Sequence, residues 1–229
     1  MSKPLFDSAL PPLEELDTDS AFPEAAAAVD AQTRAVFLRN AGIGAGAVVG
    51  GGALLGSLPS RALGAGIAKS DIAILNFALT LEYLEAAFYV EAIQKGHFTG
   101  ELDLFTRTVA AHEAAHVAFL KKALGSRAVA KPSFNFKDTT SNQAKFMATS
   151  QTLEDTGVRA YLGQAGNFKS KKLLGAAATI LTVEARHAAW IRDLRGKGNP
   201  PVPAPASFQD KRTKAQILAA VKATGFIVG

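Results

Sequence analysis

Two stretches of the chain share one pattern of acidic, basic and apolar residues. Val109–Leu120 reads VAAHEAAHVAFL, and Ile180–Ile191 reads ILTVEARHAAWI. Each contains Glu-x-x-His, and apolar residues recur at steps of three and four around that pair. Steps of this size keep side chains on one face of a helix. Because Glu and His three residues apart project from the same side, each stretch predicts a helix that presents a carboxylate and an imidazole together.

A second pair of stretches stands one helix earlier in each half of the chain. Leu81–Tyr89 reads LEYLEAAFY, and Leu153–Tyr161 reads LEDTGVRAY, so each has a Tyr seven residues after its first Glu. Those two Glu are 72 residues apart, and the two Glu of the Glu-x-x-His pairs are 71 apart. The matched spacing predicts two similar halves, each built from one Glu helix and one Glu-x-x-His helix.

Carboxylates on otherwise apolar helix faces need a compensating charge. Burying an acid costs several kcal/mol unless a cation or hydrogen bonds compensate, and four acids brought together also repel one another. Divalent metal ions remove both costs. One Glu from each of two helices, with Glu-x-x-His from the other two, is the ligand set of di-iron and di-manganese carboxylate bundles. The predicted metal ligands are Glu82, Glu113, His116, Glu154, Glu184 and His187.

The remaining pattern predicts an all-α fold, a four-helix bundle with a long crossover connection and a short C-terminal helix. Ser70-Asp71 is a good N-cap pair for the first helix, and no stretch alternates long enough to be a strand. The predicted helices span about 70–95, 101–124, 141–165, 170–195 and 211–224. Residues 126–140 form the long connection, and the Pro-rich segment 199–205 is a stiff connector.

Composition excludes several kinds of chemistry. The 229 residues include no Cys, which rules out disulfides, thiolate metal sites and Cys nucleophiles. Histidine and carboxylate ligands suit iron, manganese or zinc. The net charge of +5 divides into −6 over residues 1–30 and +11 over the rest. Because the basic residues form no long run, we interpret them as a solvated surface and expect no nucleic-acid partner.

The N-terminal residues 1–65 are predicted to lie outside the bundle, which we expect to occupy residues 66–229. The first 32 residues are acidic and rich in Pro and Ala, typical of a flexible leader. Arg34, then an apolar Gly-rich run over 41–58 and small residues to Ala65, resemble a twin-arginine export signal, although Ala35 stands where a second Arg belongs. We therefore expect an exported protein, with a membrane anchor or a cytoplasmic location as alternatives.

The helix sequences resemble those of a known family. Ile74–Tyr89, Leu153–Tyr161 and Phe208–Ile227 are similar to the desiccation-related proteins of the ferritin-like superfamily. The resemblance covers about residues 70–229 and implies a ferritin-like bundle with two divalent metal ions, of iron or manganese with zinc as an alternative. It also allows a homo-oligomer. The departure is Ala87, where a third acid is expected in the first helix.

Three residues beside the predicted ligands leave alternatives open. Glu85 also lies on an apolar line and could replace Glu82 as a ligand, or hydrogen-bond to one, but its counterpart Gly157 lacks the symmetry of the Glu82 pair. Tyr89 and Tyr161 could hydrogen-bond ligand carboxylates or relay electrons, or could be core residues with satisfied hydroxyls.

His112 and Trp190 stand close to the predicted ligands in the sequence. His112 points about a quarter-turn away from Glu113, so we expect it on the surface or beside a ligand rather than on the metal. Trp190 is expected to be a packing residue.

Two functions follow as hypotheses. In the first, the two metal ions react with O2 or peroxide, and the protein is a ferroxidase or a manganese-catalase-like oxidoreductase that protects against oxidative or drying damage. In the second, the metal only stabilises a structural, desiccation-protective protein.

Overall fold

Four long helices and one short helix form most of the described chain. The computed structural model describes residues 66–196 and 202–228, which belong to one compact unit, Leu55–Gly229. The predicted leader and signal-like segment, residues 1–65, lies outside the described residues. The helices are α5 (Lys69–Lys95), α6 (Gly100–Leu124), α7 (Gln143–Ala165), α8 (Lys171–Gly196) and α9 (Lys214–Thr224).

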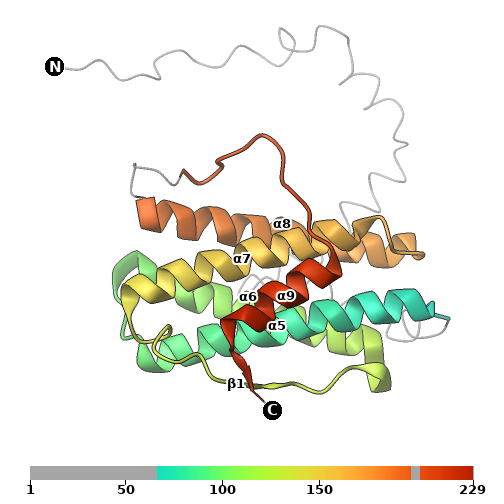
Figure 1. Ribbon diagram of the computed structural model, residues 1–229, viewed down its shortest axis with the longest axis horizontal. Helices are drawn as coiled ribbons and strands as arrows, with labels where there is room; N and C mark the ends of the chain where they lie inside the picture. The colour runs from blue at the N-terminus through green and yellow to red at the C-terminus, as the bar shows by residue number, and fades with distance from the viewer. Residues whose placement is uncertain (1–65, 197–201, 229) are drawn as a thin grey trace, which may run out of the picture. The chain divides into compact units, whose positions relative to one another are not determined.

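The four long helices pack as two hairpins. Helix α5 packs mainly on α6, and α7 packs mainly on α8. Each hairpin corresponds to one of the two sequence halves. The connection between α6 and α7 begins with a 3-10 turn, η1 (Gly125–Arg127), and then runs the length of the bundle before α7 begins (Figure 1). This is the predicted long crossover, and it confirms the all-α four-helix class.

Helix α9 lies across α5 and α7, outside the four-helix bundle (Figure 1). It begins at Lys214, three residues later than the sequence pattern indicated, because Thr213 and Gln216 form a capping box that fixes the start. Gly225 ends it in the left-handed conformation that favours glycine. Helix α7 likewise begins two residues late, since the Asn142 side chain accepts a hydrogen bond from Lys145 N at 3.0 Å.

The sequence suggested that Ser70-Asp71 caps α5, but the Asp71 carboxylate does not cap this helix. Helix α5 begins at Lys69 without a side-chain cap. Asp71 is fully buried and accepts hydrogen bonds from the backbone N–H groups of Lys169 and Ser170, each at 2.9 Å. These amides stand just before α8 and would otherwise be unpaired. The carboxylate therefore joins the start of α5 to the turn between α7 and α8.

A two-stranded antiparallel pair is the one departure from all-helical structure within residues 66–196 and 202–228. Strand β1 (Ser133–Phe134) in the crossover pairs with β2 (Ile227–Val228) after α9. Two residues are too few to produce an alternating pattern, so the sequence predicted no strand. The pairing fixes the C-terminal end of the chain against the crossover.

The apolar core has two parts. One contains Leu75, Leu79, Leu120 and Leu173, near the start of α5. The other, toward the opposite end, is rich in aromatic rings, and Phe88 contacts three of them: Tyr89, Phe136 and Phe146. Helix α5 is the one described helix long and apolar enough to cross a membrane, and 67% of its most apolar window is buried inside the bundle, as for a core helix.

Candidate metal centre

All four long helices contribute acids to the interior of the bundle. The carboxylates of Glu82 on α5, Glu113 on α6, Glu154 on α7 and Glu184 on α8 have no exposed surface. His116 is 6% exposed and His187 is 3% exposed. The structure thus brings together the six residues that the sequence predicted as ligands. They lie where the two apolar parts of the core meet.

The six side chains form two overlapping groups of four. Glu82, Glu113, His116 and Glu184 make one group, whose ligand atoms all lie within 4.8 Å of one another. Glu113, Glu154, Glu184 and His187 make the second group, within the same limit. Glu113 and Glu184 belong to both groups and would be shared by two ions bound there. Glu82 and Glu154 each belong to one group and are positioned as end ligands.

Both imidazoles turn Nδ1 toward the acids. His116 Nδ1 lies 3.2 Å from Glu82 Oε2, 3.2 Å from Glu113 Oε2 and 3.1 Å from Glu184 Oε1. In the other group, His187 Nδ1 lies 3.1 Å from Glu154 Oε2 and 3.2 Å from Glu113 Oε1. Each group therefore brings one nitrogen and three carboxylate oxygens close together, a donor set that suits a divalent metal ion.

Three buried carboxylate oxygens form no well-aligned hydrogen bond: Glu113 Oε1, Glu184 Oε1 and Glu184 Oε2. Two of them have only a histidine Nδ1 nearby, Glu184 Oε1 at 3.1 Å from His116 and Glu113 Oε1 at 3.2 Å from His187. Leaving a buried charged acceptor unpaired costs at least about 1–3 kcal/mol. All three orphaned oxygens are on the two glutamates shared between the groups. Metal ions bound in both groups would satisfy these oxygens, so the donor set fits a pair of divalent ions.

Two tyrosines hold the end carboxylates across the bundle. Tyr161 on α7 donates a hydrogen bond to Glu82 Oε1 on α5. Tyr89 on α5 donates to Glu154 Oε1 on α7, and its hydroxyl also contacts Ser150 Oγ. The Tyr of each half therefore supports the Glu of the other half. Of the three roles considered for these residues, the structure shows the hydrogen bond to a predicted ligand carboxylate. Ser150 was not singled out from the sequence.

Burial and mutual repulsion set the protonation of the acids. Burial, followed by the charge of Glu113, raises the pKa of Glu82 to about 8. The same two causes raise the pKa of Glu184 well above its usual value. Burial alone would also raise the pKa of Glu113, but hydrogen bonds from His116 and His187 outweigh it and hold that pKa below the usual range.

The histidines respond in the opposite direction. Burial opposes their charged form, but the charges and hydrogen bonds of the surrounding acids outweigh burial, and the pKa of His187 rises to about 11. The pKa of His116 is raised for the same reason, with Glu82 as the main source. In the metal-free protein, protons therefore supply the positive charge that the acids need.

Glu85 lies beside the cluster and belongs to neither group of four. It is 2% exposed, and burial followed by the charge of Glu184 raises its pKa well above the usual value. A Cβ atom placed on Gly157 would lie 3.1 Å from Glu184 Oε2 and 3.3 Å from Glu85 Oε1. The missing side chain at residue 157 thus leaves room for both carboxylates, which explains why the acid on α5 has no counterpart on α7.

His112 contacts a predicted ligand directly. Its Nδ1 lies 2.9 Å from His187 Nε2, and the two ring planes differ by 17° with centroids 5.2 Å apart. This geometry is that of two rings meeting edge to edge in nearly one plane. The pair matches the expectation of a position beside a ligand. Its partner in the other half is Val183, so the contact breaks the two-fold pattern. Trp190 packs edge-on against Phe105, as expected.

Comparison with known proteins agrees with this fold. The model of the ferritin-like domain family matches residues 70–197, which is more than half of the chain and contains all six predicted ligands. The chain therefore belongs to the ferritin-like domain family. Among curated proteins, none matches the sequence.

Proposed function

We propose that the buried cluster binds two divalent metal ions, iron or manganese, and that the protein uses them as an oxidoreductase acting on Fe(II), O2 or peroxide. The observation that carries the proposal is the set of orphaned oxygens on Glu113 and Glu184. These oxygens face both histidines, and protons are the one positive charge available to them in the metal-free protein. A pair of redox metals supplies one-electron steps and a binding place for small oxygen species.

The residues around the ions would control geometry and access to water. Tyr89 and Tyr161 hold one oxygen of Glu154 and of Glu82, so that each end carboxylate turns its other oxygen toward the histidine of its group. The apolar parts of the core lie on either side and exclude bulk water, which strengthens every charge interaction inside. Glu85, whose raised pKa keeps its proton, adds no further negative charge beside Glu184.

Metal analysis of Glu113→Gln is the sharpest test of the site. Glutamine keeps the size of the side chain but removes the bridging charge from both groups, so we expect occupancy of both positions to fall. The matched control is Glu101→Gln, which changes an exposed acid on the same helix and should retain both ions. The measurement is metal per chain after loading with Fe(II) or Mn(II) and desalting. Full occupancy in Glu113→Gln would contradict the site.

Redox activity needs a separate measurement. Fe(II) added in air to the metal-free protein should give a ferric absorbance faster than buffer, or the manganese-loaded protein should consume peroxide. Metal binding that raises the melting temperature without either reaction would instead favour the structural, protective function. The resemblance to desiccation-related proteins and the export-signal-like segment support a protective role outside the cytoplasm as part of the same proposal.

A further inference from the structure

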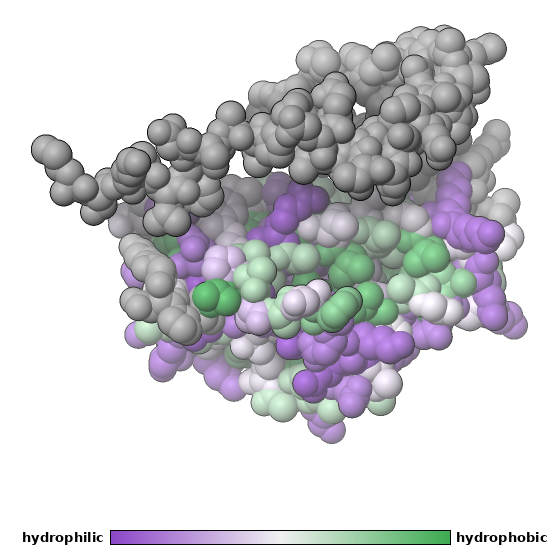
Figure 2. All heavy atoms as spheres, turned by 90° about the horizontal axis from the view of Figure 1, so that it is seen from above, coloured by the Kyte–Doolittle hydropathy of each residue, from purple (hydrophilic) through white to green (hydrophobic). Residues whose placement is uncertain are grey.

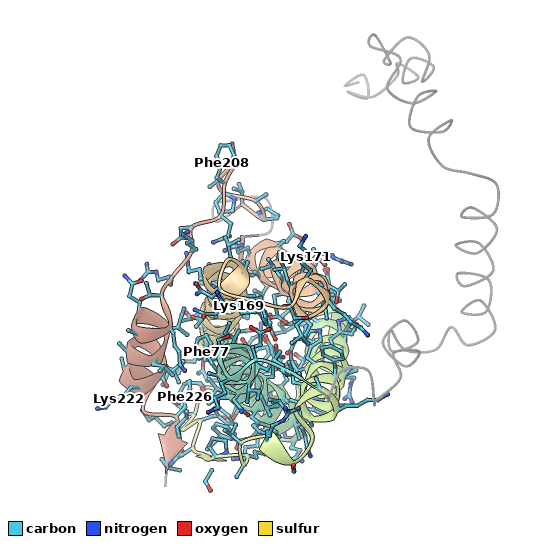
Figure 3. All side chains as sticks on the ribbon, turned by 90° about the vertical axis from the view of Figure 1, so that its right-hand side faces the viewer. Phe77, Lys169, Lys171, Phe208, Lys222 and Phe226 are labelled. Carbon is cyan, nitrogen blue, oxygen red and sulfur yellow. The ribbon has the colours of Figure 1, made fainter. Side chains whose placement is uncertain are left out.

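One end of the bundle carries lysines from three separate parts of the chain. The apolar cluster around Leu75, Leu120 and Leu173 shows that the start of α5, the end of α6 and the start of α8 meet there. The two hydrogen bonds from the turn before α8 to Asp71 fix the same meeting point. Figure 3 views this end directly and labels two of its lysines. The exposed lysines of this end, here called the basic end, are Lys69, Lys121, Lys122, Lys169, Lys171 and Lys172.

No exposed acid accompanies these lysines. Residues 66–78, 117–131 and 163–176 build the basic end, and their one acid, Asp71, is buried and committed to backbone amides. Within the described residues, none of the six ammonium groups forms an ion pair. At the opposite end, exposed acids such as Glu101, Asp138 and Asp193 stand among the bases. Figure 2 shows hydrophilic side chains at the right-hand end of the bundle, and also along its lower edge, with apolar ones between them. The excess positive charge is therefore concentrated at one end of the bundle.

Helix stability does not explain this concentration. Lys69 is the first residue of α5, and Lys171 and Lys172 are the first two residues of α8, which has no acid in its first turn. The N-terminus of a helix carries partial positive charge, so cations there are unfavourable and acids are preferred. Helix α6, by contrast, has acids in its first turn and lysines in its last. Three of the six lysines thus lower the stability of the fold. Their position points to an external anion as their partner.

We propose that the basic end docks the protein on an anionic lipid surface. The sequence before α5 favours this partner, because only ten residues separate the apolar run over residues 41–58 from Lys69, the first residue of α5 at the basic end. If that run contacts a membrane, this short connection keeps the lysines within reach of the headgroups. Each lysine near an anionic membrane contributes about 1 kcal/mol of attraction. The cations are lysines, strongly hydrated point charges, and not the planar arginine forks that dominate nucleic-acid recognition. This inference does not depend on the metal centre.

Vesicle binding by the full chain tests the proposal. The measured quantity is the ratio of binding to phosphatidylcholine vesicles with and without phosphatidylglycerol, so that any contribution of the apolar run cancels. We expect a ratio well above one that falls with added salt. The double variant Lys171→Gln/Lys172→Gln should lower the ratio by about tenfold or more. Its melting temperature should equal or exceed that of the parent, since both substitutions relieve the start of α8.

The matched control is Lys95→Gln/Lys145→Gln, which removes the same charge from lysines of α5 and α7 that pair with nearby acids outside the basic end. It should leave the ratio unchanged. Equal loss in both variants would show that only net charge matters and would overturn the proposal. A ratio of one would also overturn the proposal, even if the reason were that the acidic residues 1–30 bind to these lysines. Tighter binding to an oligonucleotide than to anionic vesicles at the same salt would replace lipid by nucleic acid.

Discussion

At the scale of single residues, the contact between His112 and His187 makes the two histidines of the metal centre unequal. A histidine that ligates metal through Nδ1 carries its proton on Nε2, and the partner of that proton fixes the ring and its tautomer. His112 Nδ1 is the acceptor in the correct place, 2.9 Å away. His116 is the histidine of the other group of four. For that group, Val183 occupies the position that corresponds to His112, so no histidine supports His116 in the same way. The two metal positions should therefore differ in affinity.

Replacing His112 by phenylalanine should weaken metal binding about tenfold or more at the position that His187 serves. Phenylalanine keeps a ring of similar size but cannot accept the hydrogen bond. Competition with a chelator measures the two affinities separately. His97→Phe, an exposed histidine in the turn between α5 and α6, is the control and should bind metal as the parent does. If the His112→Phe and His97→Phe variants bind metal with the same affinities, His112 does not support His187.

At the scale of helices, Asp71 and the C-terminal segment hold elements together that are distant in sequence. Asp71 lies almost 100 residues before the amides that it accepts from. Arg212 in the segment before α9 donates its backbone N–H to Arg159 O at 3.3 Å, which holds that segment against α7. In each contact, a backbone N–H group that would otherwise be unpaired donates a hydrogen bond.

Asp71→Ala should lower the free energy of unfolding by about 2–4 kcal/mol, because it leaves two amides at the start of α8 without their charged acceptor. Denaturant unfolding gives the value. Asp193→Ala removes an exposed acid from α8 and should change stability by less than about 0.5 kcal/mol. A similar loss in the two variants would show that the buried contact contributes nothing specific.

Gly163→Ala should detach the segment before α9 from α7. A Cβ atom at this position would lie 1.9 Å from the backbone oxygen of Arg212, so the segment must move. We expect faster hydrogen exchange in α9 and a lower melting temperature. Gly175→Ala is a matched change in α8, where nothing lies within 4 Å of the new Cβ. It should stabilise the protein by about 0.5–1 kcal/mol through helix propensity. Unchanged exchange in α9 of Gly163→Ala would contradict this packing.

At the scale of the whole molecule, the bundle encloses a charged layer between two apolar parts of the core, and its stability must follow the charge of that layer. The acids in the layer are balanced by protons when metal is absent and by metal when it is present. Protons and metal ions compete for the same side chains. Stability, metal content and pH are therefore coupled.

The metal-free protein should lose stability as pH rises from 6.5 to 8. Folding raises the pKa of Glu82 from 4.5 to about 8, so the folded state holds a proton that the unfolded chain has released, and this stabilisation is lost as pH approaches 8. Folding raises the pKa of His187 from 6.5 to about 11, so its stabilisation is complete below pH 6.5 and is lost as pH rises toward 11. Both changes have the same sign.

The metal-loaded protein should behave differently over that range. Metal binding requires the deprotonated ligands, so its stabilisation grows as pH rises. The difference in melting temperature between the loaded and the metal-free protein should widen from pH 6.5 to 8. Thermal unfolding with and without bound metal measures it. A metal-free melting temperature that rises across this range would show that the acids are not buried as described.

The sequence by itself determined the helices, the two-fold repeat and the six predicted ligands. These features are local: helical periodicity fixes which side chains share a face, and a buried acid is conspicuous among apolar neighbours. The helix ends predicted from Gly96, Gly125 and Gly166 agree with the structure to within a residue. The resemblance to the ferritin-like family was visible in the same local sequence patterns, and the family match confirms it.

Only the tertiary structure decided which residues act across the bundle. It placed Glu113 and Glu184 in both groups of four and Glu82 and Glu154 in one group each, which the spacing along the chain did not reveal. It showed that Asp71, which was expected to cap α5, instead accepts hydrogen bonds from the distant turn before α8. Lysines that look scattered along the chain gather at one end, because antiparallel packing brings the end of α6 beside the starts of α5 and α8. Partners of this kind are set by how helices pack, and sequence spacing along one helix carries no information about them.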